Sequence, residues 1–252
     1  MRSAVRAGPS DSSVRGMGVL PVLRWDNIRT VCMYVTYLDL HTDSTYDKGW
    51  RRQRVARTKH DVRSEATRRR LVTAARTLFG ARGYADVGTE EIVRAAGVTR
   101  GAMYHQFRDK ADLFAAVAEE VEAEIAERIA GAAGVEADPV GALRAGARLF
   151  LDACAEPEVE RIILLDAPAV LGWEAWRDLA GRYGLGLLQF GLQAAIEAGA
   201  IVPQPVAPLA HVFIGALNES ALYVARAEDP AAAREQCVAI LDRILHGMMA
   251  GS

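Results

Sequence analysis

Residues 89–110 read Thr-Glu-Glu-Ile-Val-Arg-Ala-Ala-Gly-Val-Thr-Arg-Gly-Ala-Met-Tyr-His-Gln-Phe-Arg-Asp-Lys, a stretch that fits two short helices with a sharp turn between them. We predict that Thr89 caps the first helix, and the two glutamates that follow it suit the positive end of the helix dipole. Gly97 ends this helix, because glycine adopts the left-handed conformation at little steric cost. Thr99 then caps a second helix over residues 100–107. The stretch therefore predicts a helix-turn-helix.

The second of these helices carries an outer face that suits DNA. Ala102, Met103 and Phe107 can form its inner face, while hydroxyl, guanidinium, phenol and imidazole groups point outward. An arginine can bind a guanine edge with two hydrogen bonds, and hydroxyl and imidazole groups can reach phosphate oxygens. We expect Arg100 to read a base edge and Gly101 to allow close approach of the backbone. The expected DNA-binding residues are Thr89, Thr99, Arg100, Gly101, Tyr104, His105 and Lys110.

The stretch closely resembles the DNA-binding domain of the TetR family of bacterial transcriptional regulators. The residues that carry the resemblance are Thr89, Ile92, residues 95–99, Gly101, Tyr104, Phe107 and Lys110, followed by Leu113 and Phe114. The resemblance implies an all-α fold, in which a three-helix DNA-binding domain precedes a variable helical domain for ligand binding and dimerisation. It also implies a ligand-responsive regulator, most often a repressor, that binds a palindromic operator in double-stranded DNA as a homodimer.

The charge of the chain is unevenly distributed. The formal net charge of the 252 residues is only -2, but residues 1–110 contain 21 Lys and Arg against 11 Asp and Glu, and residues 111–252 contain 9 against 21. A basic part suits a polyanion, whereas an acidic part is repelled by one, so we expect two parts with different tasks. The expected division is an extension over residues 1–58, a DNA-binding domain over residues 59–109, and a ligand-binding and dimerisation domain over residues 110–252.

Residues 1–58 have no counterpart in the resembled family. Their opening is expected to be disordered. Residues 30–40 form one β-prone run, and a lone strand is not stable. We therefore favour a start codon assigned too early, and the alternative is a real extension with a role of its own. Residues 48–70 are strongly basic. Such a run is commonly a solvated charged segment, but its place just before the first helix also suits an arm that reaches phosphates or the minor groove.

Apolar periodicity predicts helices over most of the remaining chain. Residues 63–82 carry an apolar stripe, and Gly83 follows as the stop. A helix that begins at Lys110 is expected to join the two domains and to carry a solvent-exposed acidic face formed by Glu119, Glu120, Glu122, Glu124 and Glu127. Further helical segments are predicted over residues 139–156, 159–165, 173–198, 208–227 and 230–249. No strand alternation competes with this all-α prediction.

The last two helices are the expected dimer surface, since each carries an apolar stripe. One stripe consists of Leu209, Val212, Phe213, Ala216, Leu217, Ser220 and Val224, and the other of Cys237, Ile240, Leu241, Ile244, Leu245 and Met248. Either stripe could instead be buried within its own subunit. Two such stripes at the end of a chain that reads DNA favour a four-helix interface across a two-fold axis, which matches a palindromic operator.

A small-molecule effector of unknown identity is implied by the resemblance. The candidate ligand-binding residues are aromatic or isolated polar side chains on apolar helices: Asp152, Trp173, Trp176, Tyr183, Phe190, His211 and Asn218. For each aromatic residue, simple core packing is an equally good explanation. A polar residue on an apolar helix needs a partner, which can be a ligand or a neighbouring helix.

Other classes of protein fit the sequence less well. It has no nucleophile elbow, phosphate-binding loop, HExxH zinc motif or dinucleotide fingerprint, so we expect no enzyme and no cofactor. Three cysteines without CxxC spacing argue against a disulfide framework or a metal site, and no apolar run predicts a membrane span. We expect a cytoplasmic protein that associates with the nucleoid when bound to DNA. The alternative is a non-specific architectural DNA-binding protein, against which the acidic second part argues.

Overall fold

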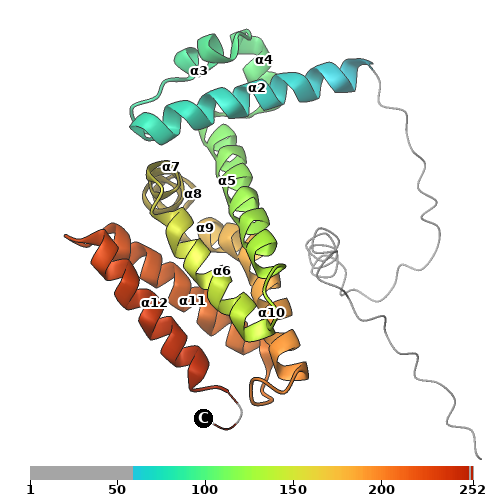
Figure 1. Ribbon diagram of the computed structural model, residues 1–252. Helices are drawn as coiled ribbons and strands as arrows, with labels where there is room; N and C mark the ends of the chain where they lie inside the picture. Colours follow the sequence, from blue (N-terminus) through green and yellow to red (C-terminus); the bar gives the residue numbers. More distant parts are fainter. Residues whose placement is uncertain (1–58, 250, 252) are drawn as a thin grey trace, which may run out of the picture.

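The structure, a computed structural model, describes residues 59–249 and 251, and within them all regular elements are helices (Figure 1). In chain order they are α2 (Lys59–Arg82), α3 (Thr89–Ala96), α4 (Arg100–Gln106), α5 (Lys110–Ala133), α6 (Pro139–Cys154), α7 (Pro157–Val159), η2 (Glu160–Asp166), α8 (Ala167–Leu171), α9 (Trp173–Ala180), η3 (Gly181–Leu185), α10 (Gly186–Glu197), α11 (Val206–Ala225) and α12 (Pro230–His246). The predicted all-α fold is confirmed. None of the described helices is long and apolar enough to cross a membrane.

The first three of these helices form a small domain at one end of the molecule. Leu71 and Phe79 of α2, Ile92 of α3 and Met103 of α4 are completely buried in its core, so the long helix serves as the base on which the two short ones pack. Figure 1 shows α3 and α4 lying against α2 on the side away from the rest of the chain. The predicted helix-turn-helix is therefore formed and faces outward.

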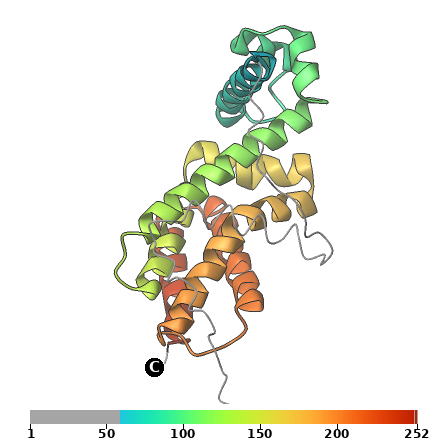
Figure 2. The ribbon, with the colours of Figure 1, turned by 90° about the vertical axis from the view of Figure 1, so that its right-hand side faces the viewer.

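Helix α5 connects this domain to the remaining helices. Its first turns belong to the core of the small domain, where the ring of Phe114 packs edge-on against Phe79 at a centroid distance of 5.4 Å and against Tyr84 at 5.2 Å. Its later turns pack along α6, and the second view shows α5 descending from one domain into the other (Figure 2). Helix α5 therefore contributes to the cores of both domains.

The second domain is a bundle in which two long segments contain π-helical turns. The predicted helix over residues 173–198 is confirmed as a continuous segment, α9–η3–α10, with the π-helix η3 in its middle. The predicted segment 159–165 is longer than expected, because η2 continues α7 and runs directly into α8. Helices α11 and α12 lie side by side at the outer edge (Figure 1).

Helix boundaries agree with the predictions apart from small shifts. α2 begins at Lys59, four residues before the predicted start, and Gly83 ends it with φ 86°. The expectations for residues 1–58, including the β-prone run 30–40 and the first part of the basic run, lie outside the described residues. The apolar residues Tyr84, Val87, Ile92, Val98, Phe107 and Leu113 are all buried or partly buried in the core.

Candidate DNA-binding and ligand-binding sites

The turn between α3 and α4 is built from two local signals in the sequence. Gly97 adopts the left-handed conformation with φ 60° and ψ 42°, and the amide of Val98 donates to the carbonyl of Val93. Thr99 Oγ1 accepts a hydrogen bond from the amide of Ala102 at 3.2 Å, which confirms it as the cap of α4. Arg70 of α2 donates to the carbonyl of Gly97 at 2.7 Å and so holds the turn against the base helix.

Helix α4 divides its side chains between the core and solvent. Met103 is completely buried and Phe107 is 3% exposed, whereas Arg100, Gly101, Tyr104 and His105 are exposed. The guanidinium of Arg100 lies 5.7 Å from the centre of the Tyr104 ring and 3.6 Å from a carboxylate oxygen of Glu90 on α3. These contacts are exposed and weak. Arg100 is therefore held above the helix but can leave Glu90 for a base edge.

The other two DNA-binding candidates, Thr89 and Lys110, differ from expectation in detail. Thr89 is the first residue of α3 and Gly88 occupies the cap position, so the predicted capping role of Thr89 is wrong. Lys110 Nζ donates hydrogen bonds to the carbonyls of Tyr84 at 2.9 Å and Val87 at 3.0 Å, and it also lies 3.9 Å from the Tyr84 ring centre. Lys110 thus fastens the loop before α3, and its phosphate contact stays a prediction.

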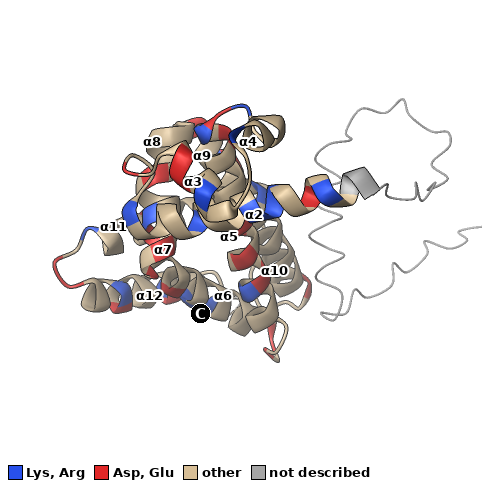
Figure 3. Ribbon diagram, turned by 90° about the horizontal axis from the view of Figure 1, so that it is seen from above, with Lys and Arg blue, Asp and Glu red and all other residues tan. Residues whose placement is uncertain are grey.

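Arginines of α2 add positive charge next to the helix-turn-helix. Viewed from the side of α3 and α4, Lys and Arg residues mark α2 at several places (Figure 3). Arg69 and Arg70 are exposed, and the guanidinium of Arg68 stacks over the Phe107 ring at 4.8 Å. The sequence prediction counted these residues only as part of a basic run; the helical register of α2 places them beside the DNA-binding helices.

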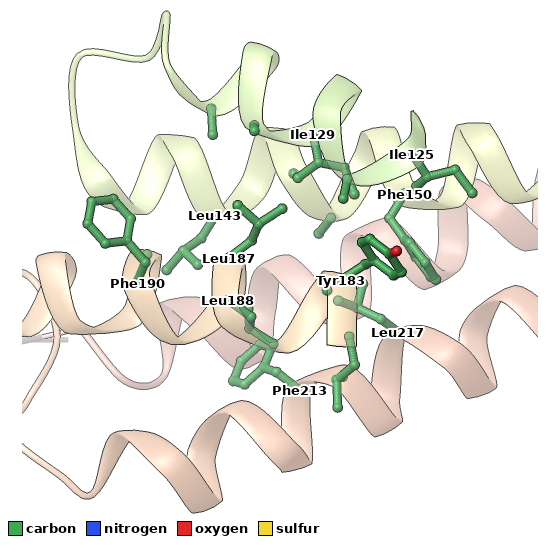
Figure 4. Close-up of a pocket in the computed structure, with 18 of the residues that line it drawn as sticks. Ile125, Ile129, Leu143, Phe150, Tyr183, Leu187, Leu188, Phe190, Phe213 and Leu217 are labelled. Atoms are coloured by element: carbon green, nitrogen blue, oxygen red, sulfur yellow. The ribbon is translucent and has the colours of Figure 1, made fainter. Parts of the chain in front are cut away.

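The second domain contains an apolar cavity of about 90 Å³, here called the inner cavity, between α5, α6, α9, η3, α10, α11 and α12. The close-up shows its labelled side chains arranged in a row, from Phe190 at one end to Tyr183 and Phe150 at the other (Figure 4). Along α5 the lining residues run from Glu122 to Ala133, a distance of about 16 Å at 1.5 Å per residue. The cavity is therefore long and narrow.

Glu122 is the single carboxylate in the lining of the inner cavity. Its side chain was predicted on the solvent face of α5, and this is wrong: the residue is only 6% exposed. Burial raises the pKa of its carboxyl from an ordinary 4.5 to about 7. Within the described part of the chain no group donates a hydrogen bond to it or pairs with it as an ion.

A second, more polar cavity of about 860 Å³, the outer cavity, lies beside the inner one. Tyr183, Ile214 and Asn218 line both cavities and form the boundary between them. Tyr183 donates to Glu119 Oε1 at 3.1 Å, and Arg182 donates to the same oxygen at 3.0 Å. Burial, together with the negative charge of Glu119, raises the pKa of Tyr183 to about 12.

The predicted ligand-binding residues separate into three groups. Phe190 lines the inner cavity, Tyr183 and Asn218 line both cavities, and the outer cavity is lined by Trp173, Trp176 and His211. The indole Nε1 of Trp176 is buried and has no hydrogen-bond partner among the described residues. Asp152 lies apart from both cavities, where its exposed carboxylate pairs with Arg234. Its polar partner is thus a neighbouring helix, one of the two explanations that the sequence left open.

A junction of charged groups joins the two domains next to α5. Arg76 of α2 makes two hydrogen bonds of 3.0 Å to the carboxylate of Glu158 and pairs with Glu124 of α5 at 2.7 Å. The backbone amide of Tyr84 donates to Asp166 Oδ2 at 2.7 Å. The contacts of Arg76 hold α2 to α7 and α5, and the contact of Asp166 fixes the loop before α3 to η2. The sequence offered no signal for the pairs Arg76–Glu158 and Tyr84–Asp166, because the partners lie 82 positions apart.

The expected dimer surface is split between core and solvent. Phe213, Leu217 and Val224 of α11 and Cys237, Leu241 and Leu245 of α12 are buried within the subunit, so each predicted stripe belongs partly to the core. The large apolar residues left exposed on these two helices are Val212, Tyr223, Ile240 and Ile244. These exposed residues form the outer face of α11 and α12. The outer face is the surface on which contact with a second copy stays a prediction.

Comparison with known proteins assigns both domains. Residues 71–117 match the family described as "Bacterial regulatory proteins, tetR family", and residues 140–248 match "Tetracyclin repressor-like, C-terminal domain". The chain is 34% identical over 109 residues to the HTH-type transcriptional regulator AcrR of Shigella flexneri, and 37% identical over 92 residues to TtgR of Pseudomonas putida. These matches cover 43% and 36% of this chain, and half or less of each of those two relatives, 50% of AcrR and 42% of TtgR.

Solved structures extend the similarity over both domains. A TetR-family transcriptional regulator from Pectobacterium atrosepticum is 35% identical, with a TM-score of 0.68, and the match covers 77% of this chain and 98% of that one. RolR in complex with resorcinol shares the fold at 22% identity and a TM-score of 0.60, over 73% of this chain and 89% of that one. Helix-turn-helix, connecting helix and helical second domain thus occur together in related chains. The protein belongs to the TetR family of bacterial transcriptional regulators.

Proposed function

We propose that the protein is a transcriptional regulator that binds a palindromic DNA operator as a homodimer and releases it when a small molecule occupies the second domain. The observation that carries the proposal is the division of α4, which anchors Met103 and Phe107 in the core while Arg100, Gly101 and His105 lie exposed. A recognition helix needs this arrangement, because its anchor fixes the depth at which its outer face enters the major groove.

In this mechanism Arg100 gives up its exposed contact with Glu90 and donates two hydrogen bonds to a guanine edge. Thr89, Thr99, Tyr104, His105 and Lys110 set the register through phosphates, and the α2 arginines add affinity that depends on salt rather than on sequence. The proposed site of action is the cytoplasm, at the operator.

The proposed effector site is the inner cavity. It is lined along three turns of α5, and only three residues separate the start of this helix from the end of α4. A ligand that displaces α5 would therefore change the position of the recognition helix relative to its counterpart in the second subunit. A structural relative, RolR, was solved with the small ligand resorcinol, which supports a ligand-responsive role for this fold.

The proposal is tested with the Arg100→Ala variant and the operator selected from random DNA by the unaltered protein. Loss of a bidentate contact is expected to reduce discrimination at one base pair by about 1–3 kcal/mol. Arg94→Ala, which removes an exposed arginine from α3, is the matched control and should weaken selected and random DNA to the same extent. Unchanged base preference in Arg100→Ala would contradict the assigned readout.

A further inference from the structure

The inner cavity, called the channel below, is formed where small residues leave space between the helices. Ala126, Ala130 and Ala133 line it from α5, and glycines contribute from α6 and η3. Gly146 has Ile129 as its nearest neighbour, where an added Cβ would lie 3.3 Å from Cγ2. A space of about 90 Å³ that extends over about 16 Å of α5 admits a slender apolar molecule and excludes a bulky one.

The two ends of this channel differ in polarity. Phe190 lies at one end of the row of labelled side chains and Tyr183 at the other (Figure 4). The carboxylate of Glu122 belongs to the Tyr183 end, because it lies close enough to raise the pKa of that phenol. Glu119, one turn earlier on α5, shows what a carboxylate at this end requires: it receives hydrogen bonds from both Arg182 and Tyr183. Glu122 has no such donors in the described structure, although it is the more deeply buried of the two.

A buried carboxylate without a donor is costly, and a ligand that supplies a positively charged donor removes that cost. We propose that the channel binds a slender, mainly apolar molecule that ends in a protonated amine, with the ammonium donating to Glu122 and the apolar tail lying along α5 toward Ala133. The inference rests on the proposed function only in identifying this channel as the effector site. It specifies the chemical class of the effector.

The charges around the channel favour a cation over an anion. The lining of the inner cavity includes Glu122 but no lysine or arginine, and Glu119 lies just beyond Tyr183. Because Glu119 is already paired with Arg182, an anionic head group would be repelled mainly by Glu122, and a neutral one would gain less from Glu122 than an ammonium does. Because Tyr183 and Asn218 also line the outer cavity, the charged end of the channel is the end next to the outer cavity.

Three probes with one tail and different head groups test the inference: decylamine, 1-decanol and decanoate. Their dissociation constants are measured by calorimetry at pH 7.5 on the full chain without DNA. Decylamine is expected to bind roughly 10–100-fold more tightly than 1-decanol, the range for a hydrogen bond to a charged group, and decanoate is expected to bind most weakly. Equal affinity for all three, stronger binding of decanoate, or no binding of any probe would overturn the proposal.

Two variants locate the contacts. Glu122→Gln is expected to lower the affinity for decylamine to that for 1-decanol and to leave 1-decanol unchanged, whereas Glu228→Gln, in the exposed loop before α12, should change neither. Ala130→Leu, which fills the middle of the channel, should weaken all three probes and keep their order. A preference for the amine that survives Glu122→Gln, or binding unaffected by Ala130→Leu, would place the ligand elsewhere.

Operator binding is measured separately on the same preparations. A protein that binds no specific DNA but keeps the head-group order would contradict the proposed function and not the channel assignment. A protein that binds its operator but shows no amine preference would contradict the channel assignment alone.

Discussion

Lys110 shows how one residue can serve the fold at a position where a DNA contact was predicted. Its Nζ satisfies two backbone carbonyls, of Tyr84 and Val87, in the loop that precedes α3. Lys110→Ala would leave both acceptors without this donor, which is expected to lower the free energy of unfolding by about 1–3 kcal/mol. Thermal unfolding checks this value, with Arg94→Ala as a control that should have little effect.

The salt dependence of operator binding separates the two roles of Lys110. If Nζ also contacts a phosphate, the variant loses roughly one unit of the slope of log affinity against log salt. A stability loss with an unchanged slope would assign Lys110 to the fold alone and remove it from the DNA contacts.

Glu122 makes stability depend on pH in a direction opposite to that of most carboxylates. Its folded pKa of about 7 lies above the ordinary 4.5, so the folded state binds the proton more tightly. The contribution of Glu122 to the free energy of unfolding is therefore greatest below pH 4.5 and is lost as the pH rises through 7. The loss approaches about 3 kcal/mol, at 1.36 kcal/mol for each unit of pKa difference.

Glu122→Gln tests this dependence without the ligand. The variant is expected to be more stable than the unaltered protein at pH 8 and to differ much less at pH 5, as measured by urea unfolding at both values. The other groups near Glu122 do not interfere, because Tyr183 has a pKa of about 12 and burial raises that of Cys154 far above neutrality. If Glu122→Gln changed the free energy of unfolding equally at the two pH values, the assigned burial of the Glu122 carboxylate would be contradicted.

At the scale of the element, local signals predicted the helices well. Gly97 and Thr99 determine the turn and cap by their own backbone and side-chain chemistry, so α3 and α4 appear where the sequence placed them. The π-helical turns of η2 and η3 were not predicted, because a 3.6-residue periodicity describes the α-helix and carries no signal for a wider turn that packing induces.

The binding-site residues were less predictable, and α5 shows why. Its large apolar residues define one buried face, and Glu122 falls outside that stripe in a run of glutamates. The second buried face is marked only by alanines such as Ala118 and Ala126, which are equally common on exposed helices. Aromatic residues did locate both cavities, since Tyr183, Phe190 and Trp176 line them, but their sequence positions could not distinguish a cavity wall from a packed core.

The junction between η2 and the loop before α3 makes a prediction at this scale. Asp166→Ala removes the acceptor of the Tyr84 amide, so the two domains should unfold less cooperatively and the Tyr84 amide should exchange its hydrogen faster. Calorimetry is expected to show the DNA-binding domain melting before the second domain. Glu174→Ala, an exposed carboxylate on α9, is the control. A single, unshifted transition in Asp166→Ala would mean that the junction does not couple the domains.

For the molecule as a whole, the exposed apolar face of α11 and α12 is the surface that we propose for dimerisation. Ile240 is 52% exposed and Ile244 is 45% exposed, on neighbouring turns of α12. Placing charges there, as in Ile240→Glu with Ile244→Glu, is expected to convert a dimer into monomers in sedimentation experiments, because each charge would be buried without a partner. The affinity for the full palindrome should fall when the dimer is lost.

The control for this variant is Val135→Glu, which adds one carboxylate at an 83% exposed apolar residue in the loop after α5. It should leave the mass unchanged. A double variant that remains a dimer would exclude the α11–α12 face as the interface and would call for a search of the remaining surface.

Sequencing of the genomic fragments that the protein binds would show whether this chain reads a specific DNA sequence as a symmetric dimer. The purified protein is mixed with fragmented genomic DNA from its source, and the bound fraction is sequenced at physiological salt. We expect strong enrichment of one palindromic sequence. Its half-sites should lie about one helical turn apart, roughly 10 base pairs, or a multiple of that distance. Weak, uniform binding without an enriched sequence would contradict it and would favour a non-specific DNA-binding protein.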